Sequence, residues 1–531
     1  MKFSIKQLFS LVIALAVVFV ASSCGDDEPT AMETPPAVTA PSASNAVVGT
    51  ALTLSFNVTV TDGFASATAT AVNGTAGTPA GIEAGATSGT LTVEFTPTAA
   101  GAGAVVLTVT DTNGNTDDAT AVITIEEVQT TFMKSGQITA DETWATGSTI
   151  ILQDRVTVVD GVTLTIEEGV VIKGEAGAGA NASALLIARG ATLNANGTSQ
   201  APIIFTSIAD EIQPGQVASP NLTPDTQGLW GGLIILGRAP ISADAEAVQI
   251  EGIPPSDTNG LYGGTTPADN SGTIRYISIR HGGQNIGEGN EINGLTLGGV
   301  GSGTTIEYVE IVGNADDGIE PFGGSVDVTN ILVWNSGDDS FDCDQAYSGT
   351  IDNFIGILGA NSDHGMELDG PEGADITPDA YTLQNGSIKG KGTGNLSGGE
   401  YADLRSDAKC NLNNIYFFNF AENSDFELDN NGVANNYLQS EINLTNLQFN
   451  VTNIAATYDD GGTMKDSNLT VATIVVEKAD TDEGEVKLDI FTQRALPSSV
   501  EVVTAPTVGA NKAAFASWTW ADAAGELADF N

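Results

Sequence analysis

Alternating apolar and polar residues recur along most of this chain in short runs that are separated by glycine, asparagine and aspartate. Between residues 274 and 448 the runs share one form: an apolar residue, any residue, Asn or Tyr, and usually a second apolar residue. Such runs begin at Ile274, Ile306, Val328, Ile351, Leu383, Leu412 and Leu444. Their spacing, about 22 residues at its shortest and about 32 at its longest, predicts stacked β coils, some of which carry insertions.

The third residue of each run forms a column if the coils stack. It is Tyr in the first two runs and Asn in the other five, which predicts an asparagine ladder inside a turn. With this repeat and this column of Asn and Tyr, the chain resembles the right-handed parallel β-helix of pectin-lyase-like proteins. Its stretch from GVTLTIEEGVVIKG to PIIFTS resembles the opening coils of β-helical surface lipoproteins. We expect an all-β chain with this β-helix over residues 128–531, whose final segment, Phe515 to Phe530, caps the last coil.

Residues 42–127 carry a different pattern. Strands such as LTLSFNVTV and GAVVLTVTD alternate with Gly, Asn and Asp turns, which predicts a small β-sandwich before the β-helix. The pattern resembles the immunoglobulin-like modules of bacterial surface proteins. Residues 24–41 contain Pro29, Pro35, Pro36 and Pro41, and we expect them to form an extended, flexible linker.

Residues 1–23 have the form of a targeting segment. Lys2 and Lys6 precede an apolar run from Leu8 to Val20, and small residues then lead to Cys24. This resembles a bacterial lipoprotein signal peptide, which implies cleavage before Cys24 and acylation of that cysteine. The acidic residues that follow resemble the tag that sends lipoproteins to the cell surface in some Gram-negative bacteria. We therefore expect a lipid-anchored protein on the outer membrane; a secretory signal with an incidental cysteine is the alternative.

The charge of the chain restricts its partners. It has 67 Asp and Glu against 18 Lys and Arg, a net charge of −49, which argues against nucleic acid and against anionic membrane surfaces. We therefore expect the protein to contact the membrane through its lipid anchor only. Two His are too few for a histidine-rich zinc or copper site. Cys343 and Cys410 lie about three coils apart, too far for a disulfide, so we expect two buried thiols.

Three acidic clusters end successive coils: DDGIE from Asp316, DDSFD from Asp338 and DHGME from Asp363. If the apolar residue of each cluster points inward, the next residues form an outward column with about 4.8 Å between neighbours. That column contains Glu320, Asp342 and Glu367, and continues with Arg405 and Glu427. Carboxylates so close repel one another unless a cation lies between them. The column predicts a calcium site; the alternative is that Asp and Asn only cap turns.

A second column, formed by Asp317, Asp339 and His364, lies two positions before the inward apolar residue of each cluster and has a likeness to a known enzyme family. The segments NADD from Asn314, DD at 338–339, DHG at 363–365 and DLR at 403–405 resemble the NTD, DD, GHG and RIK motifs of polygalacturonases, which are also β-helical. The resemblance implies that Asp338 donates a proton, that Asp317 and Asp339 position water, and that His364 and Arg405 bind substrate. A Ser follows Arg405 where the family has Lys. A lyase, with Arg405 as the base beside calcium, is a further alternative.

An outward apolar patch is the last candidate. Leu332 and Trp334 on one strand lie beside Ile355 and Ile357 on the next. Either the long insertions that follow these coils cover the patch, or Trp334 is a platform for sugar rings or a partner protein.

The sequence therefore predicts a cell-surface protein whose calcium-stabilised β-helix binds extracellular polysaccharide or a surface protein. The alternative is a polysaccharide-cleaving hydrolase or lyase that uses Asp317, Asp338, Asp339 and His364. The two differ in whether these residues line an open groove beside Arg405.

Overall fold

The computed structural model describes residues 34–530, apart from 127–129, 178, 180–181, 285–291, 372, 374–378, 393–398, 422–423, 453–456, 459–463, 467–468 and 482–483. The predicted signal peptide and Cys24 lie outside the described residues. The chain divides into two compact units, Met1–Gln129 and Thr130–Asn531. Within the described ranges, no helix has the length and apolar character needed to cross a bilayer.

The first unit is a β-sandwich. One sheet has the order β1 (Ala37–Thr39), β3 (Leu52–Thr59), β6 (Ser88–Pro97), β5 (Gly74–Ala76). The other has the order β2 (Ser44–Val47), β8 (Thr116–Glu126), β7 (Gly101–Asp111), β4 (Phe64–Val72). Alternate residues of both sheets, such as Phe56, Phe95 and Leu107, are buried in a common core, as the alternating pattern predicts.

The prediction of a flexible linker over residues 24–41 is wrong at the C-terminal end of that segment. β1 lies inside that segment, and its Val38 pairs with Val58 of β3. Prolines are typical of unpaired chain, but Pro36 and Pro41 lie outside the three residues that pair, where the missing N–H removes no hydrogen bond of the sheet.

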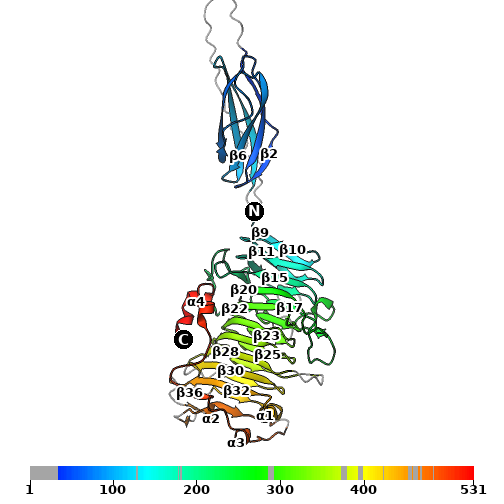
Figure 1. Ribbon diagram of the computed structural model, residues 1–531, viewed down its shortest axis with the longest axis vertical. Helices are drawn as coiled ribbons and strands as arrows, with labels where there is room; N and C mark the ends of the chain where they lie inside the picture. Colours follow the sequence, from blue (N-terminus) through cyan, green and yellow to red (C-terminus); the bar gives the residue numbers. More distant parts are fainter. Residues whose placement is uncertain are drawn as a thin grey trace, which may run out of the picture. The chain divides into compact units, whose positions relative to one another are not determined.

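The second unit is a parallel β-helix (Figure 1), in which 24 of the strands among the described residues form one sheet around an apolar core. The first coils contain β9 (Thr131–Ile138), β10 (Glu142–Trp144), β11 (Thr149–Val158), β12 (Thr163–Ile166), β13 (Val171–Gly174), β14 (Ala184–Ile187), β15 (Thr192–Asn196), β16 (Ile203–Ser207) and β17 (Leu233–Leu236). The long strands that follow are β20 (Gly272–Arg280), β22 (Thr305–Val312), β24 (Val328–Trp334), β26 (Thr350–Ile357), β28 (Tyr381–Lys389), β30 (Cys410–Phe418) and β32 (Asn443–Asn450).

Short strands alternate with the long ones and stack into a separate face, which we call the short-strand face. They are β21 (Leu295–Gly298), β23 (Ile319–Phe322), β25 (Phe341–Cys343), β27 (Met366–Leu368), β29 (Ala402–Leu404), β31 (Phe426–Leu428) and β35 (Val475–Glu477). Strand β36 (Glu501–Val503) pairs with β32. Two small hairpins stand apart from this sheet: β18 (Val248–Gln249) with β19 (Leu261–Tyr262), and β33 (Thr457–Tyr458) with β34 (Met464–Asp466). Cys343 and Cys410 are buried free thiols, as expected.

Each long strand bends at the residue that the sequence marks with Tyr or Asn. These residues have φ between 47° and 60°, the left-handed region that Asn tolerates better than most side chains. The predicted ladder is present: Asn353 donates to Asn330 at 2.6 Å and Asn414 donates to Asn385 at 3.0 Å. The bend turns the chain from one face of the coil to the next.

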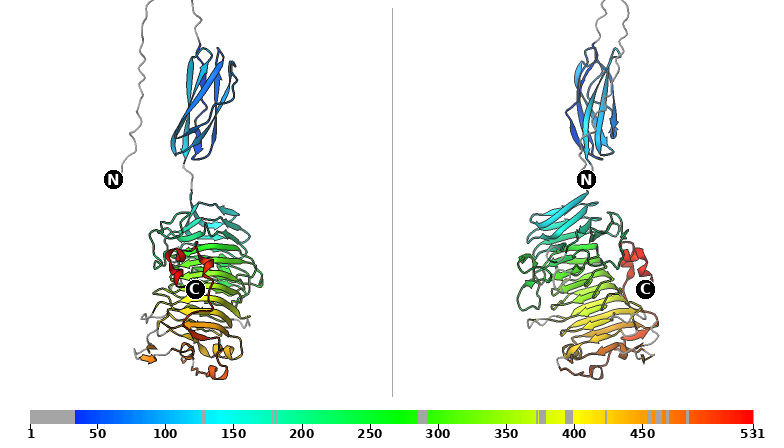
Figure 2. Two further views of the ribbon diagram at one scale, coloured as in Figure 1. Left: turned by 60° about the vertical axis from the view of Figure 1, so that its left-hand side comes forward. Right: turned by 180° about the vertical axis from the view of Figure 1, so that it is seen from behind.

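The C-terminal segment does not cap the last coil, so that prediction was wrong. The helix α4 (Trp520–Ala524) lies beside the middle coils, whereas α1 (Asn430–Leu438), α2 (Val471–Ile474) and α3 (Ile490–Gln493) lie at the end of the β-helix (Figures 1 and 2). Apolar residues of the end region, such as Leu438, Val471 and Phe491, pack against the core there. The segment instead covers an apolar side of the coils.

Candidate functional site

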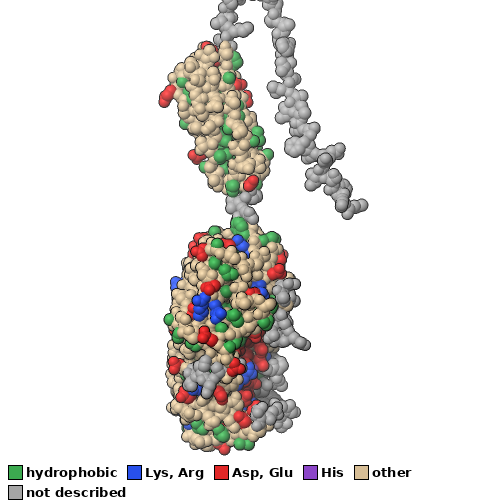
Figure 3. All heavy atoms as spheres, turned by 90° about the vertical axis from the view of Figure 1, so that its right-hand side faces the viewer, with side chains coloured by type: hydrophobic (Ala, Val, Ile, Leu, Met, Phe, Trp, Pro, Cys, Tyr) green, Lys and Arg blue, Asp and Glu red, His purple; other side chains and the backbone are tan. Residues whose placement is uncertain are grey.

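The predicted column of carboxylates lies on the short-strand face, in β23, β25 and β27. Ile319 pairs with Phe341, and Asp342 pairs with Glu367, so Glu320, Asp342 and Glu367 follow one another on successive coils. The residues on both sides of Asp342 and Glu367 belong to the core, as does Ile319 before Glu320. Acidic side chains gather in a hollow on the side of the β-helix that faces the viewer in Figure 3.

The column continues with Asp403 and Glu427, not with Arg405. Glu367 pairs with Asp403, which pairs in turn with Glu427. The predicted register was therefore wrong by two residues in this coil. A long insertion precedes the strand, and the sequence does not mark where pairing resumes.

Arg405 reaches back toward two carboxylates of the preceding coil. Its guanidinium contacts Glu367 and lies 3.3 Å from Asp369. Its side chain is 39% exposed, so solvent screens these ion pairs in part. The guanidinium nevertheless has protein partners on this face.

The carboxylates of the column are buried rather than solvated. Glu320 and Asp342 are each 7% exposed, and Glu367 is 8% exposed. Burial, followed by the charge of Asp342, raises the pKa of Glu320 well above its usual range. Burial, followed by the charges of Asp369 and Asp344, does the same to the pKa of Asp342. Buried acids this close to one another require a proton or a cation between them.

Asp342 lies at the centre of the cluster. One of its carboxylate oxygens, Oδ1, is buried and has no hydrogen-bond partner among the described residues. Asp342 belongs to two groups of oxygens that lie within 4.8 Å of one another, the first with Asp317 and Glu320, the second with Glu367 and Asp369. Ligands of one calcium ion, each about 2.3–2.6 Å from it, lie at most about 5 Å apart. Either group therefore has the dimensions of a calcium site.

Two aspartates of the second column, Asp317 and Asp339, stabilise the turns through hydrogen bonds from backbone N–H groups. Asp317 Oδ1 accepts a hydrogen bond from the backbone N–H of Asp339 at 2.9 Å. Asp339 Oδ1 accepts from the backbone N–H of His364 at 2.6 Å and lies 2.9 Å from its ring Nδ1. Burial disfavours the charged ring, but the hydrogen bond and charge of Asp339 outweigh it and raise the pKa of His364 to about 9. Turn capping is thus confirmed for these two aspartates.

The residues that resemble the polygalacturonase motifs lie together on this face. They differ in whether the side chain is exposed or is held by other protein groups. Asp338 is exposed and shares a group of close oxygens with Asp316 and Asp317. Although Asp338 is exposed to solvent, the protein packed around its carboxyl group removes part of that group's hydration and, followed by the charge of Asp339, raises the pKa of Asp338, a shift that favours proton donation. Asp317 and Asp339 are bound to backbone amides, and Arg405 is bound to carboxylates.

Sequence reasoning missed three residues of the site. Asp369 lies two residues after Glu367 and therefore on the same face, a signal that the strand alternation offered. Asp403 was missed because the register was misjudged. Asn293, whose amide donates to Glu320, comes from a coil that has no acidic cluster, and nothing in the sequence marks it.

The apolar patch is not an open binding surface, so the prediction of a platform there was wrong. Leu332 and Ile355 are fully buried and Ile357 is 3% exposed, because the C-terminal segment packs on them. Trp334 meets Trp520 edge to face, with 5.9 Å between ring centroids. The cover comes from the end of the chain rather than from the insertions after the strands.

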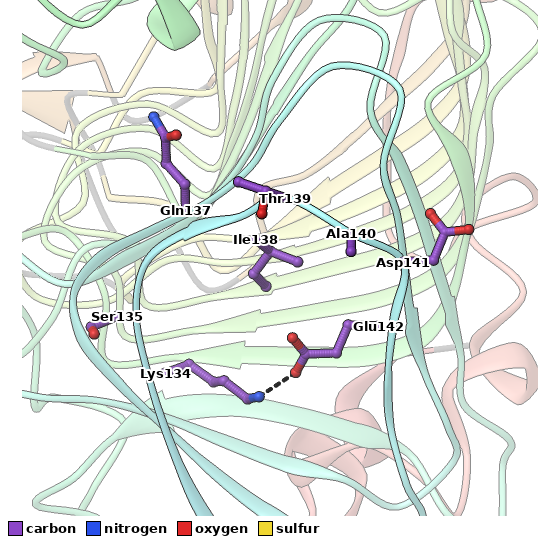
Figure 4. A pocket seen from close by; sticks show the side chains of 8 residues that line it. All are labelled: Lys134, Ser135, Gln137, Ile138, Thr139, Ala140, Asp141 and Glu142. Carbon is purple, nitrogen blue, oxygen red and sulfur yellow. Dashed lines mark ion pairs between the residues drawn. The ribbon is translucent and has the colours of Figure 1, made fainter.

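A separate hollow of about 310 Å³ lies at the first coil, between β9 and β10 (Figure 4). An ion pair joins Lys134 and Glu142 across it. The other residues that line it are Ser135, Gln137, Ile138, Thr139, Ala140 and Asp141. This lining brings together neither a cluster of carboxylates nor an aromatic ring, and we assign it no role.

Residues 136–492 match the family model of the pectate-lyase like beta helix domain. Among solved structures, a Family 28 exopolygalacturonase of Yersinia enterocolitica is similar over 80% of this chain and 93% of its own, with 10% identity and a TM-score of 0.16. The SrpA adhesin of Streptococcus sanguinis is similar over 18% of this chain, with 14% identity and a TM-score of 0.16, and 58% of that chain is covered. No curated protein matches the chain.

Proposed function

Because the chain belongs to the family of pectate-lyase-like β-helix domains, we propose that its β-helix binds calcium on the short-strand face and, through calcium, an extracellular polysaccharide. Asp342 is the central ligand. Asp317 and Glu320 complete the site on one side, or Glu367 and Asp369 on the other.

The unpartnered oxygen of Asp342 carries this proposal. A buried polar atom that lacks a hydrogen bond costs about 1–3 kcal/mol, more if it is charged. Turn capping accounts for Asp317 and Asp339 but leaves this oxygen without a partner, and the residue that bears it belongs to a cluster of carboxylates. A cation bound to it would satisfy the oxygen and offset the repulsion between neighbouring coils.

The donor set favours calcium over other metals. Both groups around Asp342 offer carboxylate oxygens alone, whereas zinc and copper prefer His nitrogen and Cys sulfur. Magnesium demands near-ideal octahedral geometry, while calcium accepts irregular sets of several oxygens. Carboxylates from stacked coils form an irregular set of this kind.

Calcium also explains how so acidic a face could bind a polysaccharide. With a net charge of −49, the chain repels uronate polymers unless a cation intervenes. Two of the cations beside the column are already engaged, Arg405 by Glu367 and Asp369, and Lys478 by Glu427. A calcium ion held by Asp342 and its neighbours would also accept oxygen ligands from outside the protein, such as the hydroxyl or carboxylate oxygens of a sugar.

The attachment of the protein belongs to the same proposal. The segment before Cys24 has the form of a lipoprotein signal peptide, so the acylated cysteine would hold the protein on the outer membrane, exposed at the cell surface. The sandwich would then be a spacer between the anchor and the β-helix.

The experiment is a binding screen against neutral and uronate polysaccharides in calcium and in EDTA. We expect wild type to bind at least one uronate polymer in calcium only, and Asp342→Asn to lose that binding. Asp118→Asn, which removes an exposed carboxylate from β8 of the sandwich, is the matched control and should bind like wild type. Equal binding in calcium and EDTA would falsify the proposal. If the protein binds a surface protein and no polysaccharide, the ligand of this face is a protein.

Cleavage of a polysaccharide is the second candidate, and the exposed carboxyl of Asp338 favours it. That group lies one coil from Asp317 and has a raised pKa, as a proton donor needs. The carboxylates that should position water are occupied by backbone amides. Assays for new reducing or unsaturated ends on the polymers that bind decide between binding alone and cleavage.

A further inference from the structure

A second pocket, of about 470 Å³, lies where the outer side of the long strands meets the C-terminal segment. The residues of its lining that matter for binding are Lys389, Tyr416, Phe418, Asn419, Asn450 and Asp529. We propose that this pocket binds a neutral sugar ring of an extracellular glycan without calcium. The site is separate from the acidic column, and its ligand chemistry differs.

The apolar part of the pocket is a pair of aligned rings. Tyr416 and Phe418 are two residues apart on β30, and their rings are stacked with 5.1 Å between centroids and 11° between planes. Phe530 of the C-terminal segment meets Phe418 edge to face at 5.1 Å. Tyr416 is only 4% exposed, so it supports Phe418 from behind, and the partly exposed ring of Phe418 presents the apolar surface that the C–H face of a sugar requires.

The polar part of the pocket is also fixed in place. Asn450 donates from Nδ2 to the hydroxyl of Tyr416 at 2.9 Å, which leaves the proton of that hydroxyl for another acceptor. Asn419 donates from Nδ2 to the carbonyl of Gly390 at 3.1 Å, which orients its amide beside Phe418. A hydroxyl donor and an amide beside aromatic rings match the alternating polar edge and apolar face of a sugar.

The charges of the pocket favour a neutral ligand. Lys389 lies 2.8 Å from Asp529 and 3.1 Å from Glu526, so its ammonium group is already paired with carboxylates. An anionic sugar would have to displace these carboxylates, and an amino sugar would meet the ammonium group. A neutral hexose or pentose requires neither change.

The test measures binding of short β-linked glucose, xylose and mannose oligosaccharides by isothermal titration calorimetry, with EDTA present throughout. We expect one class to bind wild type. Tyr416→Phe keeps the stacked ring and removes the hydroxyl, and should weaken binding roughly fivefold. Asn419→Gly removes the amide at a residue with φ of 59°, which glycine adopts freely, and should weaken binding similarly. Phe418→Ala should weaken it roughly tenfold or more.

Phe132→Ala is the control, because Phe132 is 36% exposed on β9 and lies outside the pocket. It should bind like wild type. Phe418→Ala also removes a contact to Phe530, so the two conservative variants, Tyr416→Phe and Asn419→Gly, are needed as well. Circular dichroism checks that both remain folded. Binding of no neutral oligosaccharide, or equal binding by the wild type and both conservative variants, would overturn the inference. Because EDTA is present, either result leaves the calcium-dependent proposal intact.

Discussion

Replacing Trp518 with alanine should detach the C-terminal segment from the side of the β-helix while the coils stay folded. Trp518 is 1% exposed, and its ring meets Tyr276 edge to face with 5.5 Å between centroids. Its Nε1 donates to the carbonyl of Ala514 at 2.9 Å. The ring belongs to the apolar cluster that joins the segment to Leu332 and Ile355.

The size of the effect follows from these contacts. Truncation of a packed Trp to Ala costs about 3–5 kcal/mol. The ion pairs of Lys389 with Glu526 and Asp529 are partly exposed and contribute up to about 1 kcal/mol each. They are present in wild type and variant alike, so they do not change the difference of about 3–5 kcal/mol between the two. Since about 1.4 kcal/mol is a factor of ten, the segment should open at least roughly a hundredfold more often in the variant.

Hydrogen exchange at the backbone amide of Ala521 is the direct assay, because this N–H donates to the buried carboxylate of Glu310 at 2.9 Å. Its protection should fall in Trp518→Ala, while amides in β22 and β30 keep theirs. Val486→Ala, at a side chain that is 72% exposed, should change neither. If the amide of Ala521 is as protected in Trp518→Ala as in wild type, the segment is not held by this ring and the argument is wrong.

Further predictions concern the anchor, catalysis and the ladder. Cys24→Ala should release the protein from membrane fractions, and unchanged fractionation would contradict the lipoprotein assignment. If wild type cleaves a uronate polymer, Asp338→Asn should lower turnover by roughly 10²-fold or more with binding intact; a wild type that creates no new ends is not an enzyme of this kind. Asn353→Ala should reduce the free energy of unfolding in urea by about 1–3 kcal/mol, because Asn353 bonds both Asn330 and the N–H of Asn511; a midpoint equal to that of wild type would refute this.

The β-helix could be predicted from the sequence because its rules are local. Each coil between residues 274 and 448 repeats an apolar residue that points inward and an Asn or Tyr at a left-handed bend, and these recur at a regular spacing. The position of the C-terminal segment could not be predicted in the same way. Ala521 bonds Glu310, which is 211 residues earlier, and no periodic signal relates the two.

The candidate site was predictable only where the coils are short. Glu320, Asp342 and Glu367 align as expected because few residues separate their strands. The predicted position of Arg405 is wrong by two residues, because a long insertion precedes its strand and the sequence does not mark where pairing resumes. The burial of the column could not be read from the sequence, since the donor to Glu320 comes from Asn293 on another coil.

Calcium titration by calorimetry, with wild type and Asp342→Asn compared, tests the central claim most directly. Wild type should bind calcium saturably, and Asp342→Asn should lose most of that binding. Calcium at a hundredfold excess over Kd should stabilise the β-helix by about 2.7 kcal/mol, which raises its melting temperature relative to EDTA and leaves the transition of the sandwich unchanged. Absence of binding heat in wild type, together with identical melting curves in calcium and EDTA, would mean that the carboxylates share protons and hold no cation.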